Sequence, residues 1–508
     1  SGHLWVGDLL NPHSDGEAGI VRLRDFGFRD PERARRELLQ LATGTDRHPF
    51  RRHVHQQFSA ITPFLLNALS FTAHPDVILM RLGQILARLR APATLYELLL
   101  THPVLCHFLV TLLANSEYLC GLLIRDPGLL DLVSSVEALD IASTRESLEA
   151  ELNALKSAVE SEAALYRLRD GETLRVAMRD LVRNITVAQV GDELTQLAEV
   201  ILEDALRQAR AKVAQRLGPC DAPFAVLGLG KLGGREMGYG ADLDLVFVYD
   251  ADAAAGHPSA AAYFTEVAAQ TIRILKEPTR YGLLYQIDTR LRPDGSKGVL
   301  AIDPQQLEEY YCVRAQPWER FALMKARAVA GDADFAARVE ALARDTAFAT
   351  PLDCDTMAHI DLLRSKMVAQ AAPGDIKKQE GGLAELEYTV RCRQLMHARH
   401  WPELKRGGVF AALDILEERR AMTSEDCDVL RRAYAELRRI LNRLRMMHGN
   451  QASTLPESPE DQADLAARLG IKEDLTMYVR AHCARVHAIY EAIRMEIADG
   501  AAAPPATT

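Results

Sequence analysis

The sequence predicts an α+β protein that is mostly helical and contains one small mixed sheet. The 508 residues are rich in Leu, Ala, Arg and Glu and include long stretches without Pro or Gly, which favours helices. Apolar residues recur at helical spacing near both ends of the chain, as in Ile78, Leu82 and Ile85. Short strand-like segments are confined to the middle of the chain, between residues 223 and 293.

The length exceeds what one hydrophobic core supports, so we expect several domains. The pattern predicts an N-terminal helical domain over residues 1–170 and a domain containing the sheet over residues 171–350. A C-terminal helical bundle is expected over residues 351–499, followed by a disordered tail over residues 500–508.

Composition and charge exclude several classes of protein. The net charge of −10 argues against binding nucleic acid by bulk neutralisation of phosphates. The eight cysteines include no C-x-x-C pair, so neither a disulfide framework nor a zinc site is expected, and a reducing, cytoplasmic location is favoured. No apolar stretch is long enough to cross a bilayer, so no membrane partner is expected.

A glycine-rich segment raises the question of a dinucleotide site. Gly228, Gly230 and Gly233 form G-x-G-x-x-G after an apolar run, and Asp250 follows about twenty residues later. A parallel crossover, however, needs about ten to twelve residues or more, usually with a helix. Only residues 234–241 separate Gly233 from the next predicted strand, so a Rossmann oxidoreductase is rejected on spacing.

Two aspartates in that next strand suggest a metal site instead. Asp242 and Asp244 are two residues apart in the predicted strand 242–250, so both carboxylates should leave one face, with their α-carbons about 6.6 Å apart. Like charges this close need a cation between them, and Mg²⁺ prefers such oxygen ligands together with substrate phosphates. The turn at Gly233 and Gly234 would let backbone N–H groups approach a triphosphate.

A third aspartate comes from the segment 283–293, which alternates like a strand. Its polar face is expected to carry Gln286, Asp288, Arg290 and Arg292. Three acids of this kind predict nucleotidyl transfer with two metal ions, in which Asp242, Asp244 and Asp288 are both the catalytic residues and the metal ligands.

Basic residues near these acids are candidates for holding the triphosphate. We expect Arg290, Arg292 and Lys231 to contact phosphate, together with the glycine turn. The alternatives are a salt bridge between Asp288 and one of the arginines, surface pairing of the arginines, and a structural role for Lys231 in capping the turn.

With these residues identified, the chain resembles the glutamine synthetase adenylyltransferases, and in particular their C-terminal, adenylylating half. The resemblance covers nearly the whole chain. It is carried by "GLGKLGGREMGYGADLDLVFVYD", "LYQIDTRLRPDGSKG", "WERFALMKARAVAGD" and "DIKKQEGGLAELEY", which occur in the family's order.

The resemblance implies a DNA-polymerase-β-like nucleotidyltransferase domain flanked by helical domains, with ATP and Mg²⁺ as substrate and cofactor. It implies transfer of AMP to a tyrosine of glutamine synthetase, under control of the PII signal protein and glutamine. Carried over by position, Asp242, Asp244 and Asp288 are the metal-binding aspartates, and Gly233 and Gly234 form the phosphate loop.

The sequence departs from the family pattern at two positions. Ala241 stands where Ser commonly precedes the first Asp, and Glu385 stands in place of Asp in the "GGLAELEY" block. Glu at that position and Lys325 are also familiar from the deadenylylating half, so phosphorolytic removal of AMP is the alternative activity. A non-catalytic regulatory scaffold is a further alternative. "GYGADLDLVF" and "RLRPDGSKG" favour the transferring half.

Overall fold

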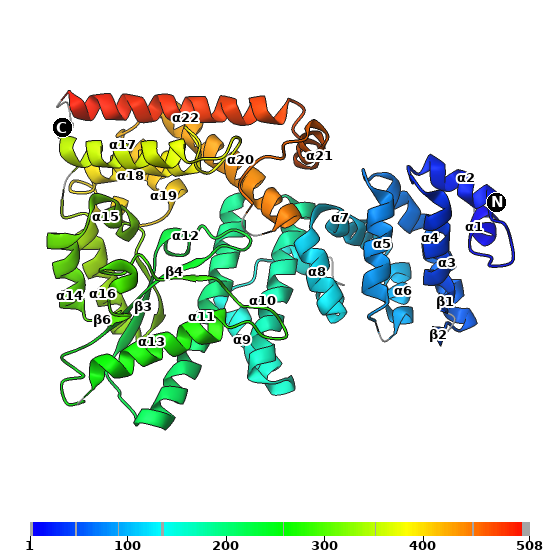
Figure 1. Ribbon diagram of the computed structural model, residues 1–508, viewed down its shortest axis with the longest axis horizontal. Coiled ribbons are helices and arrows are strands. Elements are labelled where there is room, and N and C mark those ends of the chain that lie inside the picture. The colour runs from blue at the N-terminus through cyan, green and yellow to red at the C-terminus, as the bar shows by residue number, and fades with distance from the viewer. Residues whose placement is uncertain are drawn as a thin grey trace. The chain divides into compact units, whose positions relative to one another are not determined.

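The structure is a computed structural model that describes residues 4–45, 48–89, 91–133, 137–257, 259–350, 352–449 and 452–499 (Figure 1). It is mostly helical with a small mixed sheet, which confirms the predicted fold class. The predicted tail 500–508 lies outside the described residues. The chain divides into two compact units.

The first unit comprises Ser1–Ala142, Asp170–Ile185 and Met446–Gly449 and is built almost entirely from helices. Its helices follow one another as α1 Leu4–Leu9, α2 Glu17–Asp25, α3 Pro31–Thr43, α4 Arg52–Ser70, α5 Pro75–Leu86, α6 Pro92–Thr101, α7 Val104–Asn115 and α8 Glu117–Arg125. Strands β1 Gly44–Thr45 and β2 His48–Pro49 pair with each other, and short helical turns cover Pro127–Val133, Glu137–Asp140 and Arg179–Arg183. Leucine side chains fill the interior between these helices.

The second unit comprises Ser143–Arg169, Thr186–Arg445 and Asn450–Thr508, and it contains the sheet. Helices before and around the sheet are α9 Arg145–Ala158, the part of α10 Ser161–Met178 up to Arg169, α11 Val187–Leu217, α12 Gly230–Gly233, α13 Ala260–Lys276, α14 Pro304–Glu309, α15 Pro317–Leu323 and α16 Ala333–Ala347. Helices after it are α17 Cys354–Ala369, α18 Leu383–His397, α19 Val409–Glu418, the part of α20 Ser424–His448 up to Arg445, α21 Pro459–Leu469 and α22 Leu475–Ala498. Short turns cover Gly295–Lys297, Tyr310–Arg314 and Pro402–Lys405.

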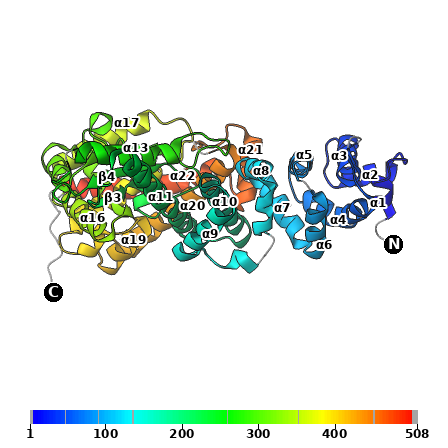
Figure 2. The ribbon, with the colours of Figure 1, turned by 90° about the horizontal axis from the view of Figure 1, so that it is seen from below.

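The five-stranded sheet has the order β5-β4-β3-β7, with β6 also pairing with β4. Its strands are β3 Phe224–Gly228, β4 Leu243–Tyr249, β5 Ile287–Asp288, β6 Ala301–Ile302 and β7 Arg327–Gly331. Strand β3 is antiparallel to β4 and β7, whereas β5 and β6 run parallel to β4. Helices α11, α13 and α16 pack around this sheet (Figures 1 and 2).

Aromatic side chains fix the centre of the sheet. The Phe224 ring stacks on Phe264 of α13 at 5.3 Å and on Phe247 of β4 at 6.1 Å between ring centroids. All three rings are fully buried. Such stacked pairs add about 0.5–1.5 kcal/mol each beyond the burial of their area, so β3 and β4 are firmly held.

The strand predictions have mixed outcomes. The segments predicted around β3 and β4 and the helix between β4 and β5 are confirmed. Because β3 and β4 are antiparallel neighbours, the glycine segment contains no crossover, and the rejection of a Rossmann turn is confirmed. The predicted strand 283–293 is wrong except at Ile287–Asp288, since only these two residues form a strand, and the chain then turns, with a positive φ at Asp294 and Gly295. Strands β6 and β7 were not predicted.

Within the described ranges, no single helix is both long and apolar enough to cross a membrane. Among the described residues, one pair of consecutive helices, α6 and α7, is long and apolar enough when taken together, and the two are bent by 117° relative to each other.

Candidate functional site

The turn between β3 and β4, residues 228–242, is called here the glycine loop, and it is packed too closely for side chains at two positions. A Cβ on Gly233 would lie 2.0 Å from the backbone oxygen of Lys325. A Cβ on Gly230 would lie 2.1 Å from Oδ2 of Asp244, and Gly230 also has a φ of +53°. The loop backbone therefore lies directly against the segment before β7 and against Asp244, which only glycine permits.

The acidic site is formed by Asp242, Asp244 and Asp288, next to this loop. Asp244 of β4 pairs in register with Asp288 of β5, and the two strands are parallel. Paired residues of neighbouring parallel strands point to the same side of the sheet, about 4.8 Å apart. Asp242 lies just before β4, rather than inside the strand as predicted, and is exposed.

Burial and the neighbouring carboxylates both act on Asp244. Burial raises the pKa of Asp244 to about 6, and the negative charges of Asp288 and Asp242 contribute to this rise. Lys377 and Arg290 oppose the rise without cancelling it. The site therefore carries an excess of negative charge, and its donor atoms are all hard oxygens, which is the chemistry that fits Mg²⁺.

Asp288 makes the salt bridge that the sequence left open as an alternative. Nε of Arg290 lies 3.0 and 2.9 Å from the two carboxylate oxygens, and the Arg290 backbone N–H donates to Oδ1 at 2.8 Å. These hydrogen bonds hold the pKa of Asp288 below its usual value. In this arrangement no group of three or more His, Cys, Asp or Glu side chains among the described residues has the geometry of a metal site.

Two of the three basic side chains predicted to contact phosphate, Arg292 and Lys231, are engaged by groups of the protein itself. Arg292 is buried and donates to backbone oxygens of the turn around it, those of Thr289, Ser296, Gly298 and Val299. Lys231 pairs with Glu387 and donates to the Tyr434 hydroxyl at 3.1 Å. Arg290 differs, because its side chain is 80% exposed beside the acidic site. Contact with phosphate stays a prediction for all three.

Two basic residues that sequence reasoning missed act on the acidic site. Lys377 lies in the turn before α18, is exposed, and its charge acts on Asp244. The Asp375 side chain fixes this turn by accepting from the Lys377 backbone N–H at 2.9 Å. Arg445 of α20 donates to the Tyr239 backbone oxygen at 3.3 Å and interacts with Asp242, while burial lowers its pKa to about 10. Lys377 lies in one of the quoted family blocks, which is the only signal that the sequence offered.

Comparison with known proteins defines the class. Residues 106–342 match the family model described as glutamate-ammonia ligase adenylyltransferase. Residues 363–494 match the model described as GlnD PII-uridylyltransferase. Both descriptions are of enzymes that transfer a nucleotidyl group, and the first match includes the glycine loop and all three aspartates. These matches indicate that the class of protein to which this chain is similar is the nucleotidyltransferases.

Curated relatives narrow the class to one family. Proteins from Thioalkalivibrio sulfidiphilus and Nitrosococcus oceani are 30% and 31% identical over 91% and 87% of this chain. One from Methylococcus capsulatus is 34% identical over 76%. All three are named bifunctional glutamine synthetase adenylyltransferase/adenylyl-removing enzyme. The chain belongs to the glutamate-ammonia ligase adenylyltransferase family, and it spans about half the length of the curated relatives it matches.

Proposed function

We propose that this chain transfers AMP from ATP to a tyrosine hydroxyl of glutamine synthetase, with Mg²⁺ as cofactor. We further propose that residues 171–350 form a polymerase-β-like nucleotidyltransferase domain between the helical domains 1–170 and 351–499. The observation that carries the proposal is the in-register pairing of Asp244 with Asp288 beneath the glycine loop, with Asp242 beside them. The family matches support the same chemistry.

The protein's own groups have distinct tasks in this reaction. Asp242 and Asp244 would hold two Mg²⁺ ions, and Asp288 the ion nearest the incoming hydroxyl. Bound there, the ions would neutralise charge on the triphosphate and align the reacting oxygens. Gly233 and Gly234, which the sequence predicts as the phosphate loop, are buried, and their N–H groups donate to Leu229 and Gly230, so contact with phosphate through them would require these hydrogen bonds to open.

Arg290 has to leave Asp288 before that carboxylate can bind a metal. Its 80% exposed guanidinium can turn towards the phosphates, where a planar fork of donors binds two oxygens at once. In the transfer, the tyrosine oxygen bonds to the α-phosphorus, the bond to pyrophosphate breaks, and the hydroxyl proton is released.

Removal of AMP by phosphate is the second candidate activity, and the relatives' printed name, which includes adenylyl removal, favours keeping it. Glu385, the departure that suggested it, is fully buried and bonded to Arg364 and His487 at 2.7 Å each. Because these contacts occupy both of its carboxylate oxygens, Glu385 supports packing of α18 and does not discriminate between the two activities.

We propose that the PII signal protein and glutamine regulate this activity. The match of residues 363–494 to a PII-uridylyltransferase model supports a C-terminal region related to proteins that act on PII.

The test incubates the chain with labelled ATP, Mg²⁺ and unmodified glutamine synthetase. The proposal expects label on the target and none with Asp242→Ala/Asp244→Ala. ADP released from pre-modified target only when phosphate is added would establish removal instead. Neither reaction with the wild-type chain would leave the non-catalytic scaffold as the explanation.

A further inference from the structure

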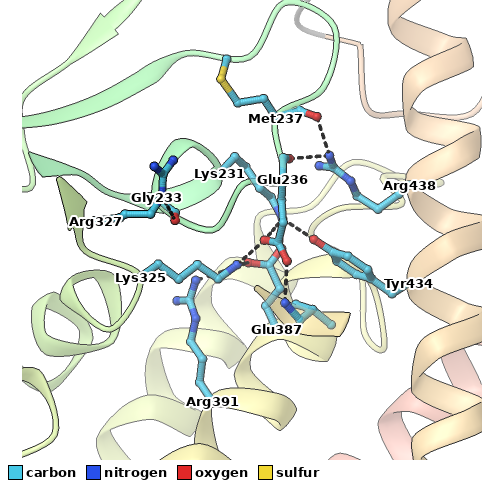
Figure 3. A network of polar contacts seen from close by, with 11 residues as sticks. Lys231, Gly233, Glu236, Met237, Lys325, Arg327, Glu387, Arg391, Tyr434 and Arg438 are labelled. Atoms are coloured by element: carbon cyan, nitrogen blue, oxygen red, sulfur yellow. Dashed lines mark hydrogen bonds and ion pairs between the residues drawn. The ribbon is translucent and has the colours of Figure 1, made fainter. Parts of the chain in front are cut away.

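A second group of charged residues lies against the glycine loop. This lysine–glutamate cluster consists of Lys231, Lys325, Glu236 and Glu387 (Figure 3). Lys231 and Lys325 both pair with Glu387, the latter at 3.2 Å, and Lys325 also donates to Glu236 at 2.6 Å. The side chains of Lys325 and Glu236 are 6% and 9% exposed, so water screens these pairs little.

The cluster joins four parts of the second unit. Lys231 and Glu236 belong to the glycine loop, Lys325 precedes β7, and Glu387 belongs to α18. Oε1 of Glu236 accepts from the backbone N–H of Val409, the first residue of α19, at 2.6 Å. The cluster therefore fixes the loop to helices that are distant in the sequence.

Helix α20 holds the same loop through two further residues. Arg438 donates to the backbone oxygens of Glu236 at 2.6 Å and Met237 at 3.2 Å (Figure 3). The Tyr434 hydroxyl accepts from Lys231, whose ammonium also lies 5.2 Å from the Tyr434 ring centroid. A cation in this position is stabilised both by the hydroxyl and by the ring.

Charge balance inside the cluster depends on Glu387. Burial raises the pKa of Glu387, but Lys231, Lys325 and Arg391 outweigh burial and hold the pKa well below its ordinary value. Burial lowers the pKa of Lys231 to about 7, while Glu387 is the main group that opposes this effect. The other charges facing Lys231 are Glu236, which favours its charged form, and Lys325 and Arg438, which disfavour it.

We infer that Glu387 is a positioning residue for the proposed nucleotidyl transfer, acting through Lys231 to hold the glycine loop against the acidic site. In this inference, Lys231 holds the glycine loop in position and does not bind phosphate itself. The part of this inference that concerns ATP rests on the proposed function, whereas the part that concerns loop order does not. Through these contacts, helices α18 and α20 determine whether the glycine loop has the conformation that would bind the triphosphate.

The first test measures hydrogen exchange in the loop of the wild-type chain and Glu387→Gln. Loop amides are protected by bonds such as Gly233 N–H to Leu229 O and Glu236 N–H to Lys231 O, both 2.8 Å. We expect their exchange to become about tenfold faster in the variant, with amides of α16 unchanged. The matched control Glu418→Gln alters an exposed residue of α19 and should change neither. Unchanged loop exchange in Glu387→Gln would overturn the inference.

A second comparison separates positioning from direct contact with phosphate. The comparison uses two variants. The single variant Lys231→Met removes the ammonium that pairs with Glu387, and the double variant Lys231→Met/Glu387→Gln removes both charges of this pair. Positioning expects Lys231→Met to speed loop exchange as Glu387→Gln does, and the double variant to exchange no faster than either single variant, because each change removes the same contact. If Lys231 bound phosphate directly, Lys231→Met would raise the KM for ATP and leave loop exchange as in wild type. This comparison still decides the question if Glu387→Gln does not fold.

The kinetic readout distinguishes failure of the inference from failure of the proposed function. Glu387→Gln should raise the KM for ATP about tenfold and leave kcat within about threefold, because the reacting groups are intact. An unchanged KM in a wild-type chain that transfers AMP would contradict positioning and leave the function standing. A wild-type chain that transfers no AMP would contradict the function, and loop exchange would still test the positioning of the loop.

Discussion

The glycine loop contacts two charged groups with opposite balance. In the acidic site, burial and the charges of Asp288 and Asp242 raise the pKa of Asp244 to about 6. In the lysine–glutamate cluster, two ammonium groups pair with two carboxylates, and the pKa of Glu387 falls well below its usual value. Asp242 is exposed, whereas the side chains of Lys325 and Glu236 in the cluster are buried.

This difference indicates which of the two groups needs a bound cation to balance its charge. The cluster is satisfied by its own residues and so stabilises the loop. The acidic site gains only Arg290 and more distant basic residues, so the folded chain retains repulsion that a bound cation would relieve. Unbalanced charge of this kind marks functional sites more often than structural ones.

The largest effect is expected from neutralising the acidic site. Asp242→Asn/Asp244→Asn should reduce AMP transfer by about 10³-fold or more, because the charge that holds the cation is lost. The melting temperature should stay the same or rise, since like charges are removed. The control Asp252→Asn changes an exposed aspartate outside the site. A rate of AMP transfer by this variant within tenfold of the wild-type rate would contradict a catalytic role for the acidic site.

The second-largest effect, on stability, is expected from adding a side chain at Gly233 in the glycine loop. Gly233→Ala places a Cβ 2.0 Å from the Lys325 backbone oxygen, so we expect the free energy of unfolding to fall by about 1–3 kcal/mol. Gly256→Ala meets no atom within 4 Å and should stay within about 0.5 kcal/mol of wild type. Urea denaturation of both variants measures the difference. Equal stabilities would mean that the loop is not held as closely as described.

The two arginines after Asp288 should respond in opposite ways. Arg292→Met leaves several turn carbonyls without a donor, and should lower the free energy of unfolding by about 1–3 kcal/mol. Arg290→Met loses an exposed salt bridge worth less than about 1 kcal/mol, but should raise the KM for ATP. Denaturation and steady-state kinetics on both variants test this division. The reverse pattern would assign phosphate contact to Arg292.

The smallest effect concerns pH and the lysine–glutamate cluster. Because the folded-state pKa of Glu387 lies below its ordinary value of 4.5, its contribution to stability is full above that value and is lost as pH falls through the folded-state pKa. Wild type should therefore lose more stability than Glu387→Gln between about pH 5 and pH 3. Melting temperatures over this range measure the effect. Parallel curves would mean that the charge of Glu387 does not matter.

Local sequence patterns were enough to predict the strands and the helix whose own residues specify their structure. The apolar run of β3, the apolar strand β4 and the helix α13 were predicted because their own residues specify them. The Asp244–Asp288 pairing was anticipated because metal chemistry requires neighbouring acids. The strand predicted over 283–293 was wrong on both sides of Ile287–Asp288, and the polar residues after Asp288 belong to a turn in which Arg292 donates to backbone oxygens.

Contacts between distant segments could not be predicted. Lys231 and Glu387 are 156 residues apart, and neither local sequence indicates the other as its partner. Lys377 faces Asp244 only because the turn before α18 returns to the sheet. The sequence also left Asp288 with two readings, and its salt bridge to Arg290 depends on a turn that the alternating pattern did not reveal.

The central claim is that the three aspartates hold divalent cations together with the triphosphate. Electron paramagnetic resonance of Mn²⁺ titrated into the chain with a non-hydrolysable ATP analogue tests it directly. We predict about two bound ions per chain, and loss of both in Asp244→Asn with the fold retained. Equal Mn²⁺ binding by wild type and variant, or tight binding of the analogue without any divalent cation, would contradict it.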